Sequence, residues 1–434
     1  MSEPDAATLA DWVADARERT LEVLAECDEE QQELPPYLCT VNPLRWELCH
    51  VAWFQDHFVL QHGLALDATD PEAERLFDSA AVGHERRWRQ EPLSQAAVGS
   101  YLSAVSDRVI DELGRHELTT ELRDLVLLSV FHEDMHGEAF TYTRQALSFQ
   151  PPASAAGRPA TSATIPFADG DIEVAGGPFR LGAEDDDRFA FDNERSAHDV
   201  ELQPFRIARL PVSQGELLAF VKEGGYEQPA IWSPAGWRWR QSISAEHPLY
   251  WKRDGEGGWL SRHFDQWLPV EPELPAVHVS WYEADAWCRW AGHRLPSEVE
   301  WEAAAVAEID DGRLGATKRA HPWGEAPPDA ELANLDARVL GCVPRGAHAA
   351  GDTPQGCRQL YGNVWEWTES TFEPYPDFEP GVYGDYSEPW FGARKVLRGG
   401  CWATRSRMLR STLRNFFTPD RRDVYAGFRT CARQ

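Results

Sequence analysis

The sequence changes character near residue 150, and this break constrains the fold more than any other feature. Before it, apolar residues recur at the spacing of one helical face. They fall in four segments, at Leu9, Trp12, Val13 and Ala16, at Leu44, Leu48, Val51 and Phe58, at Leu102, Val105, Val109 and Leu113, and at Leu125, Leu128, Phe131 and Met135. Four amphipathic helices joined by turns predict a four-helix bundle over residues 1–150.

The next segment, residues 151–164, reads PPASAAGRPATSAT and lacks hydrophobic periodicity, so it is the predicted linker. Beyond it Gly and Pro become dense, and 15 of the 19 Trp residues follow residue 230. We predict strands at 205–210 (FRIARL) and 395–400 (KVLRGG), and helices at 213–225 (SQGELLAFVKEGG) and 280–292 (SWYEADAWCRWAG). Residues 165–434 are expected to form one loop-rich α+β domain, which makes the whole chain a two-domain α+β protein.

The formal net charge of −29 argues against a nucleic-acid or anionic-membrane partner, because both need a basic face. The sequence has no run of about 18 apolar residues that could span a membrane. The N-terminal MSEPDAATLADW lacks the basic and apolar regions of a signal peptide. We therefore expect a cytoplasmic protein that acts on small molecules, with no membrane and no nucleic-acid partner.

Three histidines in the helical half have the spacing of a metal site. The segment FHEDMHGEAF places His132 and His136 four residues apart, which puts both rings on one face of a helix. The segment LRWELCHVAWFQDHF carries His50 on another predicted helix. Ligands from two facing helices can meet in a bundle core, and three imidazoles with open coordination positions suit Zn, Cu or Fe. The alternative is that these are ordinary core or surface histidines.

The string HEDMH also matches H-E-x-x-H, in which two His bind zinc and the Glu acts as general base. A zinc hydrolase is therefore a second hypothesis. The downstream HEDMHGEAFTYTRQ lacks the third His of the extended pattern, which disfavours it.

The second half carries motifs specific enough to indicate a family. PAVHVSWYEADAWCRWAGHRLPSEVEWEAAA (275–305), LYGNVWEWTES (360–370), KVLRGGCW (395–402) and LRNFFTPDRRDVYAGFR resemble the formylglycine-generating-enzyme-like, C-type-lectin-like fold, where most of these residues are architectural. Formylglycine-generating enzymes use a cysteine pair near the C-terminal end. Cys401 and Cys431 are too far apart to match it, so that oxidase activity is not expected.

A DinB-like bundle followed by this domain resembles the ergothioneine-biosynthesis sulfoxide synthases and the related selenoneine synthases. LCHVA, HEDMHGE, GNVWEW, RGGCW and LRNFF carry the resemblance over nearly the whole chain. It implies Fe(II) on His50, His132 and His136, with O2 as co-substrate. It also implies that a sulfur or selenium atom is joined to the imidazole carbon of hercynine (trimethylhistidine). Because both folds also occur without catalysis, a metal-free binding module is a further alternative.

The resemblance also indicates residues for catalysis and for hercynine. The loop EPGVYGDYSEPWFG resembles the family's tyrosine-bearing loop, so Tyr383 is the first and Tyr386 the second candidate proton donor. Asn415, Phe416 and Phe417 match the segment that contacts the trimethylammonium end of hercynine, a group that favours aromatic faces. The acidic residue often found in that segment is replaced by Phe417.

The other departures concern the imidazole of hercynine and the chalcogen donor. Met135 stands where the family often has a Gln that reaches the substrate imidazole. The ergothioneine branch binds the carboxylates of its thiol donor with arginines, and GHERRWRQ offers Arg86 and Arg87 for this role. Both a thiol such as γ-glutamylcysteine or cysteine and a selenosugar remain candidate donors, with a lean to the selenosugar, which has no carboxylates to bind.

Overall fold

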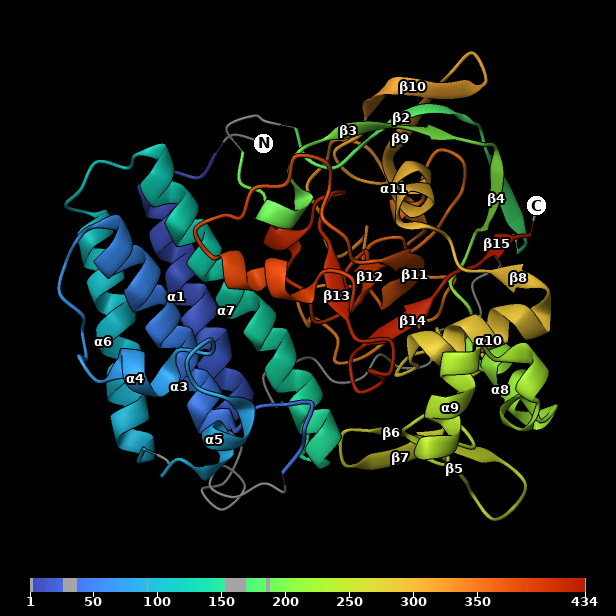
Figure 1. Cartoon of the computed structure of the whole chain (residues 1–434), viewed down its shortest axis with the longest axis horizontal. Helices are drawn as coiled ribbons and strands as arrows, with labels where there is room; N and C mark the ends of the chain where they lie inside the picture. The colour runs from blue at the N-terminus through green and yellow to red at the C-terminus, as the bar shows by residue number, and fades with distance from the viewer. Residues whose placement is uncertain (1–2, 26–36, 92, 153–168, 185–187, 434) are drawn as a thin grey trace. The chain divides into compact units, whose positions relative to one another are not determined.

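The computed structural model describes residues 3–25, 37–91, 93–152, 169–184 and 188–433. The chain divides into two compact units. Unit 1 comprises residues 1–154 and 186–189, and unit 2 comprises residues 155–185 and 190–434 (Figure 1). The predicted linker, from residue 153 onward, lies outside the described residues. The expected fold class, α+β with a helical first and a mixed second domain, is confirmed.

Unit 1 is a helical bundle. Its described helices are α1 (Ala6–Ala25), α3 (Leu44–Gln55) with the π-helical continuation η1 (Asp56–Gly63), the short α4 (Ala73–Phe77) and α5 (His84–Arg89), α6 (Gln95–Leu113) and α7 (Thr120–Leu147). The helices α1 and α3 each pack on α6 and α7. The predicted four-helix bundle is therefore confirmed, with α4 and α5 in the connection between α3 and α6.

The apolar periodicity becomes the core of this bundle. Leu9, Val13, Val105 and Val109 are fully buried, as the helical spacing predicts. The longest helix, α7, begins where the Thr119 side chain accepts a hydrogen bond from the Leu122 backbone N–H, which satisfies one otherwise unpaired donor. This 28-residue helix carries His132 and His136 near its middle, so both rings are placed inside the bundle.

Unit 2 combines small sheets with short helices. Its strands are β1 (Asp171–Val174), β2 (Gly177–Leu181), β3 (His198–Leu202), β4 (Phe205–Ala208), β5 (Trp251–Arg253), β6 (Trp259–His263), β7 (Gln266–Pro269), β8 (His293–Arg294), β9 (Ala307–Asp310), β10 (Arg313–Lys318), β11 (Trp365–Thr371), β12 (Lys395–Arg398), β13 (Asn415–Phe417), β14 (Ala426–Phe428) and β15 (Cys431–Ala432). Its α-helices are α8 (Gln214–Lys222), α9 (Pro234–Ser242), α10 (Trp281–Ala291) and α11 (Glu298–Val306). The strands and helices predicted at FRIARL, KVLRGG, SQGELLAFVKEGG and SWYEADAWCRWAG are thus β4, β12, α8 and α10.

The larger sheets have the orders β1-β4-β15-β8 and β13-β12-β11-β14. In the second, β11 runs antiparallel to β12 and parallel to β14, while β12 pairs with β13. Strand β12 ends at Arg398 because Gly399 adopts a φ of 94°, and a Cβ there would lie 2.3 Å from the Leu360 carbonyl oxygen. The RGG part of the RGGCW motif is therefore architectural.

Buried arginine–glutamate pairs connect helix α11 and the strands of the β13-β12-β11-β14 sheet. Arg398 donates to Glu298 (2.7 Å) and Glu302 (2.6 Å), and Arg414 donates to Glu298 (2.7 Å). Arg429 pairs with Glu366 at 2.9 Å and is fully buried. Each pair joins segments distant in sequence, so the network fixes α11 against β12 and the start of β13, and β11 against the end of β14. Among the described residues, no helix is long and apolar enough to cross a bilayer.

One buried histidine gives unit 2 a predicted pH dependence. Burial, and then the nearby Arg262 guanidinium, lower the pKa of His278 to about 3. The native state therefore keeps this ring neutral while the unfolded chain takes up a proton below pH about 6.5. Stability from this residue is present above that pH and is lost as the pH falls, by about 2 kcal/mol at pH 5.

We expect His278→Gln to remove this part of the acid sensitivity. Urea unfolding followed by tryptophan fluorescence reports unit 2, which holds most of the Trp residues. The loss of unfolding free energy between pH 7.5 and pH 5 should be about 2 kcal/mol smaller in the variant. His116→Gln, which removes an exposed imidazole, is the control. A pH dependence in His278→Gln parallel to that of the unsubstituted protein would contradict this account.

Candidate metal centre

Three histidines of unit 1 converge in the bundle. His50 lies on α3, and His132 and His136 lie one turn apart on α7. Each offers a ring nitrogen, and these three atoms lie within 4.8 Å of one another. The ring centroids are 5.1 Å apart for His50 and His132, and 4.5 Å apart for His132 and His136. Within the described residues, no other group of histidine, cysteine or acidic side chains meets this spacing.

Hydrogen bonds on the outer side of the cluster orient two of the rings. His50 Nδ1 lies 2.8 Å from the Phe77 carbonyl oxygen at the end of α4. His136 Nδ1 lies 2.6 Å from Glu47 Oε1. Since both partners only accept hydrogen bonds, each Nδ1 donates, and Nε2 is the nitrogen left to bind a metal. This is the arrangement of metal-binding histidines, whose second nitrogen donates to a carbonyl or carboxylate.

Burial keeps two of the rings in the metal-binding form. His50 and His132 are 3% and 4% exposed. This burial, followed by the neighbouring imidazoles, lowers the pKa of His50 and of His132 well below the ordinary value. Phe54 stacks on His132 at 3.6 Å with an interplanar angle of 7°, and Trp46 stacks on His50 at 5.2 Å. The aromatic contacts restrict the rotation of both rings.

The donor set fits a divalent transition metal. Three imidazoles with their nitrogens converging suit Fe, Zn or Cu far better than Ca or Mg, which prefer oxygen ligands. Three protein ligands also leave coordination positions for small molecules. The cluster predicted from the sequence is thus brought together by α3 and α7, and His50, His132 and His136 are the residues that would hold the metal.

The glutamate of the HEDMH string is directed elsewhere. Glu133 is 1% exposed and accepts from Arg17 Nε at 2.8 Å and from Arg17 Nη2 at 3.2 Å. Arg17 lies on α1 and also donates to the Leu102 carbonyl and to Gln55. A general base of a zinc hydrolase must reach a metal-bound water. Glu133 instead neutralises a buried guanidinium between helices, which disfavours the hydrolase hypothesis.

The other predicted residues of unit 1 are Met135, Arg86 and Arg87, and they differ in how closely they approach the histidine cluster. Met135 precedes His136 on α7 and is half-buried. Arg87 stacks on Trp46 at 4.3 Å and donates to the Val82 and Ser79 carbonyls and to Asn42. Arg86 is exposed on α5. Arg87 is therefore joined to the cluster through the Trp46 ring, and its guanidinium serves the local structure.

Three of the predicted residues of unit 2, Tyr383, Tyr386 and Phe416, belong to one aromatic cluster. Tyr386 lies 5.4 Å from Phe416 and 6.0 Å from Tyr383, between ring centroids. Phe416 is buried against Phe372, at 3.9 Å. Because side chains alternate along a strand, Asn415 and Phe417 of β13 point to the opposite face from Phe416, and both are half-buried. Burial raises the pKa of Tyr386 well above its ordinary value, so its phenol keeps its proton.

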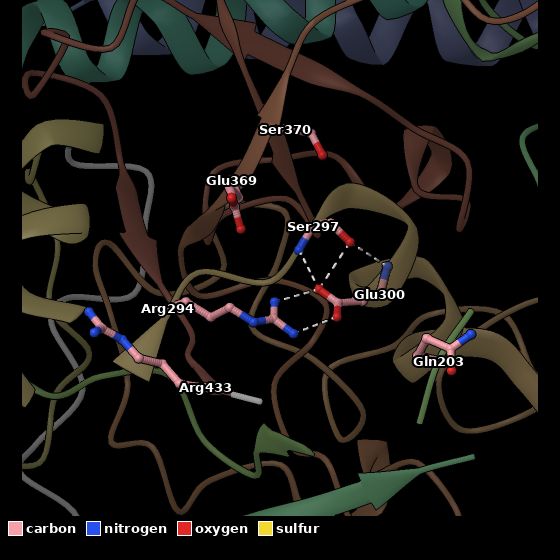
Figure 2. A pocket seen from close by; sticks show the side chains of 7 residues that line it. All are labelled: Gln203, Arg294, Ser297, Glu300, Glu369, Ser370 and Arg433. Atoms are coloured by element: carbon pink, nitrogen blue, oxygen red, sulfur yellow. Dashed lines mark hydrogen bonds and ion pairs between the residues drawn. The ribbon is translucent and has the colours of Figure 1, made fainter. Parts of the chain in front are cut away.

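A separate hollow of unit 2 contains none of the predicted residues. It is lined by Gln203, Arg294, Ser297, Glu300, Glu369, Ser370 and Arg433. Figure 2 shows Arg294 and Ser297 converging on Glu300, with Arg294 donating at 2.6 and 2.7 Å and the Ser297 backbone N–H at 2.7 Å. These bonds anchor the first turn of α11. Their role is structural.

Three functional contacts were missed in the sequence: the Glu47 carboxylate, the Phe77 carbonyl and the Phe54 ring. Glu47 lies three residues before His50, so both belong to one face of α3. That spacing was the available signal. The partner at Phe77 is a backbone carbonyl, which every residue has, so the sequence cannot indicate it.

Comparison with known proteins identifies the family of both units. Residues 12–140 match the DinB superfamily, and residues 158–434 match the family described as Sulfatase-modifying factor enzyme 1-like domain. The hercynine oxygenase of Mycolicibacterium thermoresistibile is 36% identical over 436 residues, which cover 98% of this chain and 95% of that protein. The hercynine oxygenase of Mycobacterium tuberculosis is 39% identical over 431 residues, 97% of each chain. This chain belongs to the ergothioneine-biosynthesis sulfoxide synthase family.

The family relation extends through both units. By contrast, the formylglycine-generating enzyme of Thermomonospora curvata is 31% identical over 292 residues, which cover 58% of this chain and 90% of that enzyme. The match to that enzyme thus covers little more than half of this chain, whereas the matches to the hercynine oxygenases cover nearly all of it.

The structural role of Glu133 leads to a stability prediction. Arg17→Met should leave the buried Glu133 carboxylate unpaired and lower the free energy of unfolding by about 3 kcal/mol or more. Arg17→Met combined with Glu133→Leu removes both charges and should cost less than Arg17→Met alone. Urea unfolding followed by far-UV circular dichroism measures both. Equal losses in the single and double variants would contradict the assignment of Glu133 as the partner of Arg17.

Proposed function

We propose that this chain is an iron(II)- and O2-dependent oxygenase that acts on hercynine and joins a selenium or sulfur atom to its imidazole carbon. The observation that carries the proposal is the cluster of three converging imidazoles, of which His50 and His132 are buried. The family supports the substrate, because relatives similar over nearly the whole chain are hercynine oxygenases.

Iron fits this chemistry better than zinc. An imidazole C–H gains a bond to selenium or sulfur only if electrons are removed, and zinc has no redox chemistry. When bound, Fe(II) supplies the electrons with which O2 is activated. The chain's contribution is to fix three imidazole nitrogen donors and to leave positions open for small ligands.

Asn415 and Phe417 are the residues we assign to hercynine. They share the face of β13 opposite to the buried Phe416, which supports the strand from below. The Phe417 ring already accepts the Arg421 guanidinium at 5.0 Å, so its face attracts cations. A trimethylammonium group, which cannot donate hydrogen bonds, suits such a ring. Met135, beside His136, would offer the substrate imidazole an apolar contact in place of a hydrogen bond.

The environment of Arg87 favours a donor without carboxylates. Its guanidinium donates to three oxygens of unit 1 and stacks on Trp46, and this arrangement supports α5. Arg86 is exposed and remains the better placed of the two to contact a ligand. A selenosugar needs no arginine clamp, whereas γ-glutamylcysteine or cysteine presents carboxylates. The selenosugar is therefore our preferred donor.

The reaction is tested by O2 uptake. Fe(II)-loaded protein with hercynine should consume O2 with a selenosugar faster than with γ-glutamylcysteine or cysteine, and mass analysis should find one new C–Se or C–S bond. His132→Ala should abolish both iron binding and uptake, while His57→Ala, at a half-exposed histidine outside the cluster, should keep them. If the protein binds iron but consumes no O2 with any of the donors, the assignment of hercynine as substrate is wrong.

The tyrosine loop allows a paired test. Tyr383→Phe should lower kcat about 100-fold with little change in KM for hercynine, because it removes only a proton donor. Tyr386→Phe should have a much smaller effect, since the Tyr386 ring packs on Phe191 and Phe416 and Phe keeps that packing. The reverse order of effects in steady-state kinetics would assign the proton to Tyr386.

A further inference from the structure

The Glu47 carboxylate is buried beside the histidine cluster. Its side chain is 4% exposed, and Oε1 lies 2.6 Å from His136 Nδ1. Oε2 is also buried, and no hydrogen-bond partner for it occurs among the residues that the structure describes. Nor does any described lysine or arginine come within ion-pair distance of this carboxylate. The imidazole of His136 is thus the hydrogen-bond partner of the Glu47 carboxylate.

Other buried carboxylates of the chain are compensated differently. Glu133 pairs with the Arg17 guanidinium. Asp56 accepts from the backbone N–H and the hydroxyl of Thr69. In unit 2, Glu298 pairs with Arg398 and Arg414. Each of these has a guanidinium or several hydrogen bonds, whereas Glu47 has one hydrogen bond to a ring that belongs to the cluster.

A buried carboxylate with one partner is costly, because it has lost its hydration and gained little in return. A cation on the opposite nitrogen of the same imidazole would offset that cost. The short hydrogen bond would increase the electron density that the ring offers to this cation. His50 is backed by a neutral carbonyl, so the two rings would differ as donors.

We propose that Glu47 is a positioning residue of the metal centre: it fixes His136 with its proton on Nδ1 and supplies the negative charge against which the cluster binds a cation. The centre then consists of three imidazole ligands and one carboxylate that acts through His136. This inference rests on the metal centre of the proposed function and concerns metal binding alone, independent of hercynine and of the donor.

The test compares three variants of the full chain by competition of Co(II) with a chromophoric chelator. Glu47→Gln, which can still accept the hydrogen bond but has no charge, should bind Co(II) 10- to 100-fold more weakly, as expected for the loss of such a partner. Glu47→Asp should recover part of the affinity because the charge returns. Glu74→Gln, the same change at an exposed carboxylate that contacts Trp53 and His57, should bind as the unsubstituted chain does.

The reduction potential of the bound iron is a second measurement, and it would not change if Glu47 had a purely structural role. The negative charge favours Fe(III) over Fe(II), so Glu47→Gln should raise the potential, by about 59 mV for each tenfold change in that preference. Unchanged Co(II) affinity and potential in Glu47→Gln would overturn the proposal.

A measurement on the unsubstituted chain covers the case in which Glu47→Gln does not fold. In the Zn(II)-loaded protein, the His136 Nδ1 proton should resonate further downfield than the His50 Nδ1 proton, because only His136 donates to a carboxylate. Equal shifts would overturn the proposal. If the chain binds Co(II) tightly but the Fe(II)-loaded protein does not oxidise hercynine, the proposed function is refuted and this inference stands. If the chain does not bind Co(II) at all, both are refuted.

Discussion

Three imidazoles that converge in one helical bundle, two of them buried and the third partly exposed, are the constraint on which the rest of unit 1 depends. Each polar ring loses its hydration on burial, and this cost must be offset inside the protein. The chain offsets it with the Phe77 carbonyl for His50 and the Glu47 carboxylate for His136. Aromatic rings then surround the cluster, so its geometry follows from packing that is already required for the core.

This constraint explains several features of the bundle. The short helix α4 ends where its last carbonyl meets His50, so the connection between α3 and α6 completes the site. The Arg17–Glu133 pair joins α1 to α7 one residue from His132, which fixes the helix that carries two of the three clustered histidines. The acid that the HEDMH string presents as a catalytic base is thus part of the scaffold. In unit 2, the buried Arg414–Glu298 pair has the same fixing role directly before Asn415 at the start of β13.

Local patterns were sufficient to predict most of the elements and the convergence of the three histidines. Helical spacing gave Leu9, Val13, Val105 and Val109 as core residues, and all are fully buried. The i, i+4 spacing of His132 and His136 places two rings on one face wherever α7 lies, which is why the cluster could be anticipated. The predicted strand KVLRGG was two residues too long, because Gly399 and Gly400 adopt positive φ values that end β12.

Contacts between distant segments could not be predicted in this way. Glu47 is 89 residues from His136, and Arg17 is 116 residues from Glu133, so each acid resembled a solvated polar position on an amphipathic helix. The π-helical continuation of α3 was likewise missed, because Phe58 keeps an apolar spacing compatible with an α-helix. The burial of Phe416 beside the half-buried Asn415 and Phe417 depends on the strand pairing of β13 with β12.

X-ray absorption spectroscopy of the iron-loaded chain tests the central claim most directly, since it identifies the ligands of the metal without reference to a substrate. The account predicts one iron per chain with three imidazole ligands and no carboxylate ligand from the protein. A first shell with a carboxylate from Glu47 or Glu133, or an iron that stays bound when His132 and His136 are both replaced by Ala, would contradict it.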